Sequence, residues 1–137
     1  MESVEIVWFK RDLRVSDHAP LMNAATAGKV LPIYIIEPKY CALPDVSRRH
    51  WHFIYDSLIT LNDELTKRGA PLVIRKGDAV SVLEALRKTY GSITLWSHEE
   101  TGNGWTYARD LRVLEWCLAH GIAWHETPSG GVVRRLK

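Results

Sequence analysis

The chain has 137 residues, 46% of them hydrophobic and 25% charged, which is ordinary for a single globular domain with its own core. Its 18 basic and 16 acidic side chains leave a net charge of +2, so overall charge gives no reason to expect attraction to DNA or a membrane. No apolar run approaches the roughly 18 residues of a spanning helix, and the start carries acids where a secretory signal carries lysines. We therefore expect a cytoplasmic protein with no membrane partner.

Short apolar runs rich in β-branched and aromatic residues predict strands, and apolar residues spaced by three and four predict helices. In chain order the expected elements are a strand at Val4–Phe9, a helix between Asp17 and Gly28, a strand at Val30–Ile36, a helix over Trp51–Leu65, a strand at Leu72–Ile74, a helix over Ala79–Tyr90, a strand at Ile93–Trp96, a helix over Tyr107–Leu118 and a strand at Ile122–Trp124.

The helix boundaries are marked by residues of the expected types. N-caps are predicted at Asp17, Ser47 and Asp78, and helix ends at Gly28, Gly69, Gly91 and Gly121. Strands that are apolar on both faces and alternate with helices indicate a parallel sheet covered on both sides. The expected fold is a Rossmann-like, three-layer α/β/α domain with a five-stranded parallel sheet.

In such sheets ligands bind beyond the carboxyl ends of the strands, in the crevice where the strand order reverses. This rule points to the loops Lys10–Asp17, Glu37–Val46, Lys76–Asp78 and Ser97–Trp105. We expect the cationic first loop and the acidic, glycine-bearing fourth loop to converge on the same rim of the sheet.

The first loop packs three cations around one acid. Lys10 or Arg11 could face an anionic ligand or a neighbouring domain while Asp12 holds a guanidinium, although a solvated turn with an internal salt bridge is the alternative. In the fourth loop, Glu99 and Glu100 could accept hydrogen bonds from a heteroaromatic ligand that stacks on Trp105. An exposed acidic loop is the alternative there.

Other signals exclude several functions. No G-x-G-x-x-G follows the first strand and no G-x-x-x-x-G-K-[ST] occurs, which argues against classical NAD binding and phosphoryl transfer. No paired-cysteine or H-E-x-x-H metal motif is present, and Cys41 and Cys117 are expected to be reduced thiols. His18, in the first turn of its helix, is expected to be a surface side chain rather than a ligand.

The segment Val7–His18 closely resembles the W-F-R-R-D-L-R-x-x-D-N signature that opens the photolyase and cryptochrome family. His18 stands where the family usually has Asn. The resemblance continues through the sequence in Ile36–Pro38, Ser47–Arg49, Gly77–Asp78 and Glu99–Asp110.

This resemblance implies that residues 1–127 form the family's N-terminal α/β antenna domain, and that 128–137 begin a linker to a helical FAD-binding domain missing from this sequence. The antenna would hold methenyltetrahydrofolate, a deazaflavin or FMN, and FAD would lie only in the missing domain. The full-length protein would carry out light-driven, FAD-dependent repair of pyrimidine dimers, with damaged DNA and its own C-terminal domain as partners. No catalytic residue is implied within this chain.

By analogy with the family's antenna sites, seven residues are candidate chromophore contacts: Lys10, Arg11, Glu37, Trp51, Ile54, Glu99 and Glu100. The cations around Arg11 could instead hold two domains together. Two other functions remain open, a cryptochrome-like blue-light photoreceptor and a stand-alone nucleotide-binding module of the universal-stress type.

Overall fold

The structure, a computed structural model, describes residues 3–10, 12–16, 18–41, 48–99 and 104–127, with only the backbone for 48–52. These residues form, in order, β1 (Val4–Phe9), α1 (Ala19–Ala27), β2 (Lys29–Ile36), α2 (Pro38–Cys41), α3 (Arg48–Lys67), β3 (Val73–Lys76), α4 (Ala79–Tyr90), β4 (Ile93–His98), α5 (Gly104–His120) and β5 (Trp124–Thr127).

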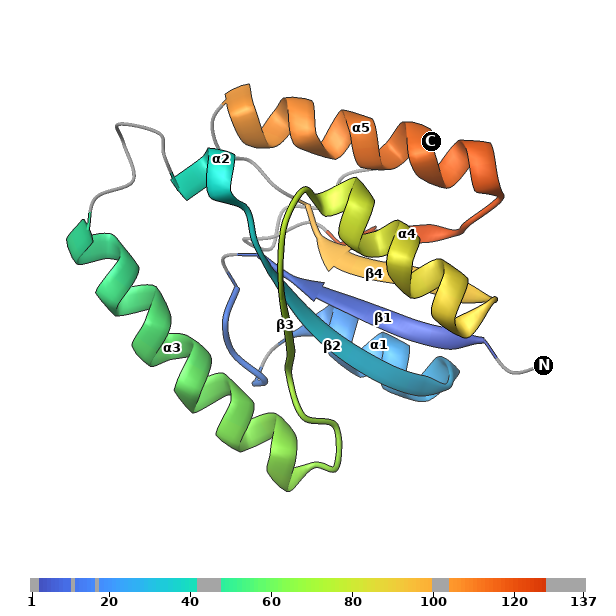
Figure 1. Cartoon of the computed structure of the whole chain (residues 1–137). Coiled ribbons are helices and arrows are strands. Elements are labelled where there is room, and N and C mark those ends of the chain that lie inside the picture. The colour runs from blue at the N-terminus through green and yellow to red at the C-terminus, as the bar shows by residue number, and fades with distance from the viewer. Residues whose placement is uncertain (1–2, 11, 17, 42–47, 100–103, 128–137) are drawn as a thin grey trace.

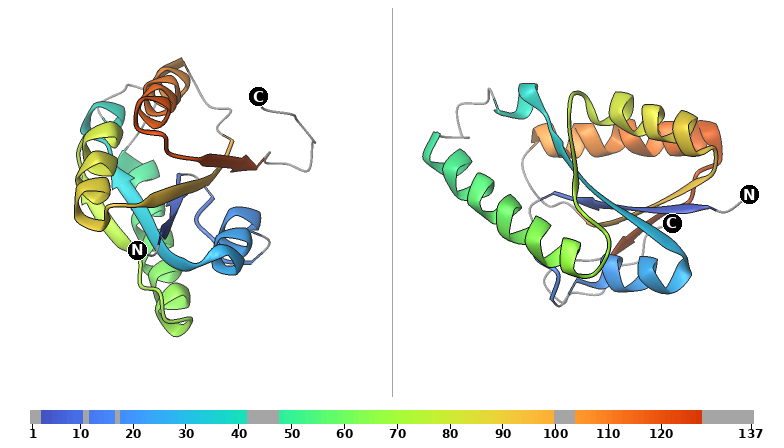
Figure 2. Two further views of the ribbon diagram at one scale, coloured as in Figure 1. Left: turned by 90° about the vertical axis from the view of Figure 1, so that its right-hand side faces the viewer. Right: turned by 60° about the horizontal axis from the view of Figure 1, so that its bottom comes forward.

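The five strands form one sheet in the order β3-β2-β1-β4-β5, and every neighbouring pair is parallel. The central strand β1 is buried along its whole length, because β2 and β4 flank it and helices cover both of its faces. Helices α4 and α5 lie on one face of the sheet, and α1 and α3 lie on the other (Figures 1 and 2). The predicted three-layer parallel fold is confirmed.

Successive side chains of β1 point to opposite faces, so the strand contributes to two separate cores. Ile6 and Trp8 pack with α4 and α5, whereas Val7 and Phe9 pack with α1 and α3. Both cores lie within the described residues. None of the described helices is long and apolar enough to cross a membrane.

Two predicted strands are displaced toward their carboxyl ends. β5 begins at Trp124 rather than Ile122, because the Ile122 N–H bonds the Cys117 carbonyl and closes α5 instead of joining the ladder. β3 continues to Lys76, since its pairing with β2 extends past the apolar residues into an exposed, polar edge. No side chain of these two edge strands is fully buried, so backbone pairing rather than apolar residues sets the strand bounds.

The predicted cap at Asp78 is confirmed, since its carboxylate accepts a hydrogen bond from the Ser81 N–H at 3.3 Å. The cap of α1 was assigned wrongly to Asp17. It is His18, whose Nδ1 accepts from the Leu21 N–H at 3.1 Å. Asp17 itself and the predicted cap Ser47 lie outside the described residues.

Candidate functional site at the carboxyl rim of the sheet

The loops after β1 and β4 meet at one rim of the sheet because these two strands are parallel neighbours. Lys10, directly after β1, donates from Nζ to the backbone carbonyl of His98 at 3.3 Å. From β1 the chain continues to β2 on one side, and from β4 it continues to β5 on the other, so this rim is where the strand order reverses. The expected convergence of the two loops is confirmed.

A buried network of charges fills this rim. Lys10 Nζ lies 3.2 Å from Asp110 Oδ2, and Arg109 Nε donates to Asp110 Oδ1 at 2.7 Å. The Arg109 guanidinium also donates to Oε1 of Glu37, the residue that directly follows β2. Because the Lys10 and Arg109 side chains are nearly fully buried, their charges depend on these carboxylates for compensation.

Aromatic rings enclose the two cations. Lys10 Nζ lies 4.4 Å from the centre of the Trp8 ring, and the Arg109 guanidinium lies 4.8 Å from the same ring. Arg109 also lies 5.8 Å from the ring of Trp105, which in turn lies 5.3 Å from Tyr40 on α2. Helix α5 thus joins the ends of β1 and β2 through both charge and ring contacts.

A small cavity of about 30 Å³ opens between these groups, enough for about two water molecules. It is lined by Trp8, Phe9, Lys10, Tyr34, Ile35, Glu37, Tyr40, Cys41, Thr106 and Arg109. Aromatic walls with a few charged groups at the end of a parallel sheet are typical of a site for a small organic ligand.

Glu37 lines this cavity and has an unpaired hydrogen-bond acceptor. Burial raises its pKa to about 7, even though the adjacent Arg109 favours the ionised form. Its second carboxyl oxygen, Oε2, is buried and has no hydrogen-bond partner among the described residues. An unsatisfied buried oxygen is costly, so Oε2 favours a hydrogen-bond donor in the cavity, and a ligand N–H that reaches it satisfies this acceptor.

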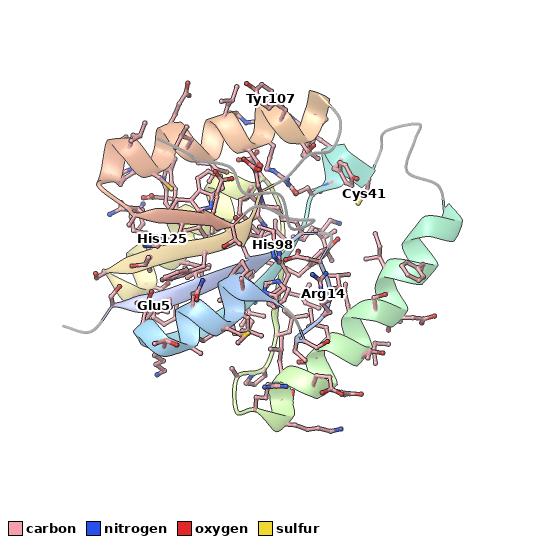
Figure 3. The ribbon with its side chains drawn as sticks, turned by 180° about the vertical axis from the view of Figure 1, so that it is seen from behind. Glu5, Arg14, Cys41, His98, Tyr107 and His125 are labelled. Carbon is pink, nitrogen blue, oxygen red and sulfur yellow. The ribbon has the colours of Figure 1, made fainter. Side chains whose placement is uncertain are left out.

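A second cluster lies on the same rim around Asp12. Its Oδ2 accepts hydrogen bonds from His18 Nε2 and from His98 Nδ1, the latter at 2.6 Å. His98 comes from the end of β4 and is labelled in Figure 3. His18 has no exposed surface, so the expectation of a surface side chain was wrong. The sequence suggested a guanidinium as the partner of Asp12, whereas the structure places two imidazole rings there because α1 and β4 both approach the first loop.

The composition of this cluster, two histidines and a carboxylate close together, is also that of many metal sites. The hydrogen bond from the Leu21 N–H requires an unprotonated Nδ1 on His18, so the ring proton sits on Nε2 and faces Asp12. A metal would need the lone pair of that same Nε2. We therefore assign Asp12, His18 and His98 a structural role: their hydrogen bonds hold the first loop against α1 and β4.

Replacing Asp12 by Asn is expected to destabilise the protein by about 2 kcal/mol at pH 7, because two buried N–H donors lose a charged acceptor. Burial alone would raise the pKa of Asp12, but the bonds from His18 and His98 hold it well below its usual range. The ionised carboxylate therefore stabilises the fold above about pH 4, and this contribution fades as the pH falls further.

Urea unfolding followed by tryptophan fluorescence at pH 7 and pH 3 measures this effect. Asp56→Asn, at an exposed position of α3, is the matched control and should change stability little at either pH. A destabilisation by Asp12→Asn that is equally large at both pH values would contradict the assignment.

The structure brings together only some of the predicted contact residues. Lys10 and Glu37 line the cavity. Ile54, a residue of α3, packs against the core on the face of the sheet that α1 and α3 cover. Glu99 lies on the same rim, half-buried, with its N–H bonded to the Thr127 carbonyl at 2.7 Å. Arg11, Glu100 and the side chain of Trp51 lie outside the described residues.

Sequence reasoning missed the residues that organise the site. Arg109 and Asp110 were read as part of a motif, without a role, and Tyr40 was placed in a loop. The apolar spacing from Tyr107 to Leu118 suggested a different buried face for α5, whereas the structure buries the face that carries Arg109 and Val113. A charged residue on a buried helix face needs a partner, and such a position is a signal of a site.

The sequence matches the family model described as DNA photolyase over residues 5–135. It is also similar to "Cryptochrome DASH, chloroplastic/mitochondrial" of Oryza sativa subsp. japonica, with 30% identity over 142 residues that cover 98% of this chain and 23% of the relative.

Two solved structures have a similar fold. A bacterial class III photolyase from Agrobacterium tumefaciens matches with a TM-score of 0.83 and 27% identity, covering 93% of this chain and 26% of that one. An archaeal photolyase from Sulfolobus tokodaii, described with two FAD molecules that imply a novel light-harvesting cofactor, matches with a TM-score of 0.78 and 27% identity, covering 91% of this chain and 29% of that one. The chain thus spans about a quarter of the length of each of these proteins.

Proposed function

We propose a function from one premise, that this chain belongs to the DNA photolyase family, whose model covers nearly all of it. It corresponds to the N-terminal α/β part of the photolyase structures and serves as the antenna domain of a photolyase-type protein. Residues 1–127 form this domain in our proposal, and 128–137 begin the link to a helical domain that binds FAD.

For the whole protein we propose light-driven repair of pyrimidine dimers in DNA, with reduced FAD in the second domain as the electron donor. The similarity to two photolyases supports this reading. A blue-light photoreceptor is the alternative, because a cryptochrome is also among the relatives, but no feature of the described residues favours it over repair. The family match gives the universal-stress alternative no support.

A cytoplasmic location remains a prediction. The rice relative is named as chloroplastic and mitochondrial, and that name applies to that protein.

The observation that carries the antenna proposal is the unpartnered Oε2 of Glu37 in an aromatic-lined cavity. A heteroaromatic ring with an N–H donor satisfies this oxygen, and the rings of Tyr40 and Trp105 offer stacking faces on one side. Methenyltetrahydrofolate, a deazaflavin and FMN all have such a ring. When bound, any of them supplies absorption in the near ultraviolet or blue and passes the excitation on.

The cavity is smaller than these chromophores, so binding requires Tyr40 and Trp105 to separate from their present 5.3 Å. Lys10 and Arg109 are already paired with carboxylates, so we assign them the role of positioning Glu37 and Trp8 rather than of holding a phosphate. Arg11, Trp51, Ile54, Glu99 and Glu100 remain proposed contacts.

Titration of the purified chain with FMN, 8-hydroxy-5-deazaflavin and 5,10-methenyltetrahydrofolate, followed by chromophore fluorescence polarisation, tests the proposal. At least one should bind, and Glu37→Gln should weaken its binding about tenfold or more. The amide oxygen of Gln stays with Arg109, so its NH2 group faces the ligand N–H in place of the carboxylate oxygen that accepts from it. Glu115→Gln, an exposed position on α5, is the matched control and should bind like the parent chain.

Failure of all three chromophores to bind the parent chain would refute the antenna proposal. Equal binding by the parent chain and Glu37→Gln would place the chromophore elsewhere on the domain.

A further inference from the structure

A groove lies between the edge strand β3 and helix α4. It is bounded by Arg75 and Lys76 on the strand and by Val82, Leu86 and Tyr90 on the helix, and we call it the α4 groove. Its volume is about 400 Å³, compared with about 30 Å³ for the cavity at the carboxyl rim. Sites for small organic molecules typically have volumes of roughly 300–1,000 Å³. The α4 groove therefore has room for a ligand as it stands.

The α4 groove is open because β3 is the outermost strand on its side of the sheet. β3 pairs with β2, and α4 follows it directly and runs back across the sheet (Figure 1). The other flank of α4 packs against α5, where Glu84 accepts a hydrogen bond from the Trp116 indole N–H at 2.9 Å. The groove is separate from the rim cavity, since none of the described residues lines both.

The walls of the groove combine an apolar floor with a cationic side. Val82 and Leu86 are buried and form the floor, and Tyr90, which is 38% exposed, presents part of its ring at the end of the helix. Arg75 and Lys76 are exposed on the strand. The helical residues that line the groove run from position 81 to position 90, so it is about 14 Å long at about 1.5 Å per residue. A ligand that matches these walls has an apolar body and an anionic group.

The positive charges of Arg75 and Lys76 have no carboxylate partner within the described part of the chain. The Arg75 guanidinium donates to the backbone carbonyl of Ile74 at 3.2 Å, and its other N–H donors remain available for an anion. The acid next along the chain, Asp78, lies 3.9 Å from Arg112 of α5 and is thus shared with a cation outside the groove. The groove therefore favours a ligand of negative charge.

We propose that the α4 groove binds a small phosphate ester that carries a flat ring, such as a nucleoside monophosphate. The two positive charges of Arg75 and Lys76 match a phosphate dianion, and a guanidinium offers paired donors to phosphate oxygens. The ring lies on Leu86 and reaches Tyr90, whose side chain favours an aromatic partner over an aliphatic one. This site is additional to the rim cavity and does not depend on the antenna proposal.

Calorimetric titration of the purified chain with AMP, 1-naphthyl phosphate, adenosine and inorganic phosphate tests the proposal. AMP or 1-naphthyl phosphate should bind at least about tenfold more tightly than adenosine or inorganic phosphate, because each of the latter lacks one half of the ligand. The binding should weaken as salt is added, since the two cations are exposed.

Two variants locate the ligand in the groove. Arg75→Gln removes one of the charges, and Ala85→Leu fills the space beside Leu86 with a side chain that a helix accepts well. Each should weaken the binding about tenfold or more. Lys67→Gln, an exposed position on α3 at the other face of the sheet, is the matched control and should bind like the parent chain. Glu37→Gln should also bind like the parent, which separates this site from the rim cavity.

Three outcomes would overturn the proposal. If neither AMP nor 1-naphthyl phosphate binds, Arg75 and Lys76 are charges that keep the sheet edge from pairing with another strand. If inorganic phosphate binds as tightly as AMP, the apolar floor has no part in recognition. If neither Arg75→Gln nor Ala85→Leu weakens the binding, the ligand lies elsewhere on the domain. Circular dichroism checks that both variants, at exposed positions, keep the fold of the parent chain.

Discussion

Replacement of Arg109 by Met is expected to lower the free energy of unfolding by about 3–5 kcal/mol at pH 8, the largest effect that we predict for a single substitution. Methionine fills much of the space of the arginine stem, so the loss reports on charge rather than on packing. Removal of the guanidinium leaves Glu37 buried beside Asp110 without its cation. It also removes one of the two positive charges beside the Trp8 ring and leaves Lys10 there.

The double variant Arg109→Met, Glu37→Gln should recover at least half of that loss, because the uncompensated carboxylate is removed as well. Arg112→Met on the same helix is the matched control. Its guanidinium is about half exposed and lies 3.9 Å from Asp78, so its replacement should cost less than about 1 kcal/mol. Urea unfolding at pH 8 measures all three variants, and a double variant no more stable than Arg109→Met would argue against the buried ion pair.

The second large effect is a pH dependence that depends on Glu37. Burial raises its pKa from an ordinary 4.5 to about 7 in the folded protein, so the folded state holds this proton more tightly than the unfolded state. Protonation of Glu37 therefore favours folding below pH 4.5, and this contribution is lost as the pH rises through 7. A pKa shift of this size corresponds to about 3 kcal/mol in the free energy of unfolding.

Glu37→Gln should remove this dependence of the free energy of unfolding on pH. Between pH 4.5 and pH 8 the free energy of unfolding of the parent chain is expected to fall by about 3 kcal/mol more than that of the variant. Urea unfolding at several pH values measures both curves. Glu115→Gln should follow the parent curve. A parallel decline of the parent chain and Glu37→Gln would show that the slope has another source. Because Glu37→Gln is expected to be at least as stable as the parent at pH 8, weaker chromophore binding by this variant cannot be attributed to unfolding.

The sequence alone determined the layered architecture of this protein. Strands such as Val4–Phe9 are apolar on both faces, and this pattern is compatible only with a sheet covered by helices on both sides. It also located the functional rim, because parallel strands place all their carboxyl ends at one edge. The sequence therefore places the cationic turn at Lys10 and the turn after His98 at the same edge, where Lys10 Nζ bonds the His98 carbonyl.

Only the tertiary structure decided which side chains meet at that rim. Arg109 and Glu37 are 72 positions apart, and Asp12 and His98 are 86 apart. Their pairing depends on strand order and on the rotation of α5, which no local pattern encodes. His18 was misjudged for the same reason, since its position in the first turn of a helix suggests exposure, whereas contacts with Phe9, Asp12 and His98 bury it. Local periodicity locates the helices, but it does not fix the covered face, since the apolar residues Tyr107 and Leu118 of α5 are exposed. The partners of a buried charge are likewise set by segments that are distant in the chain.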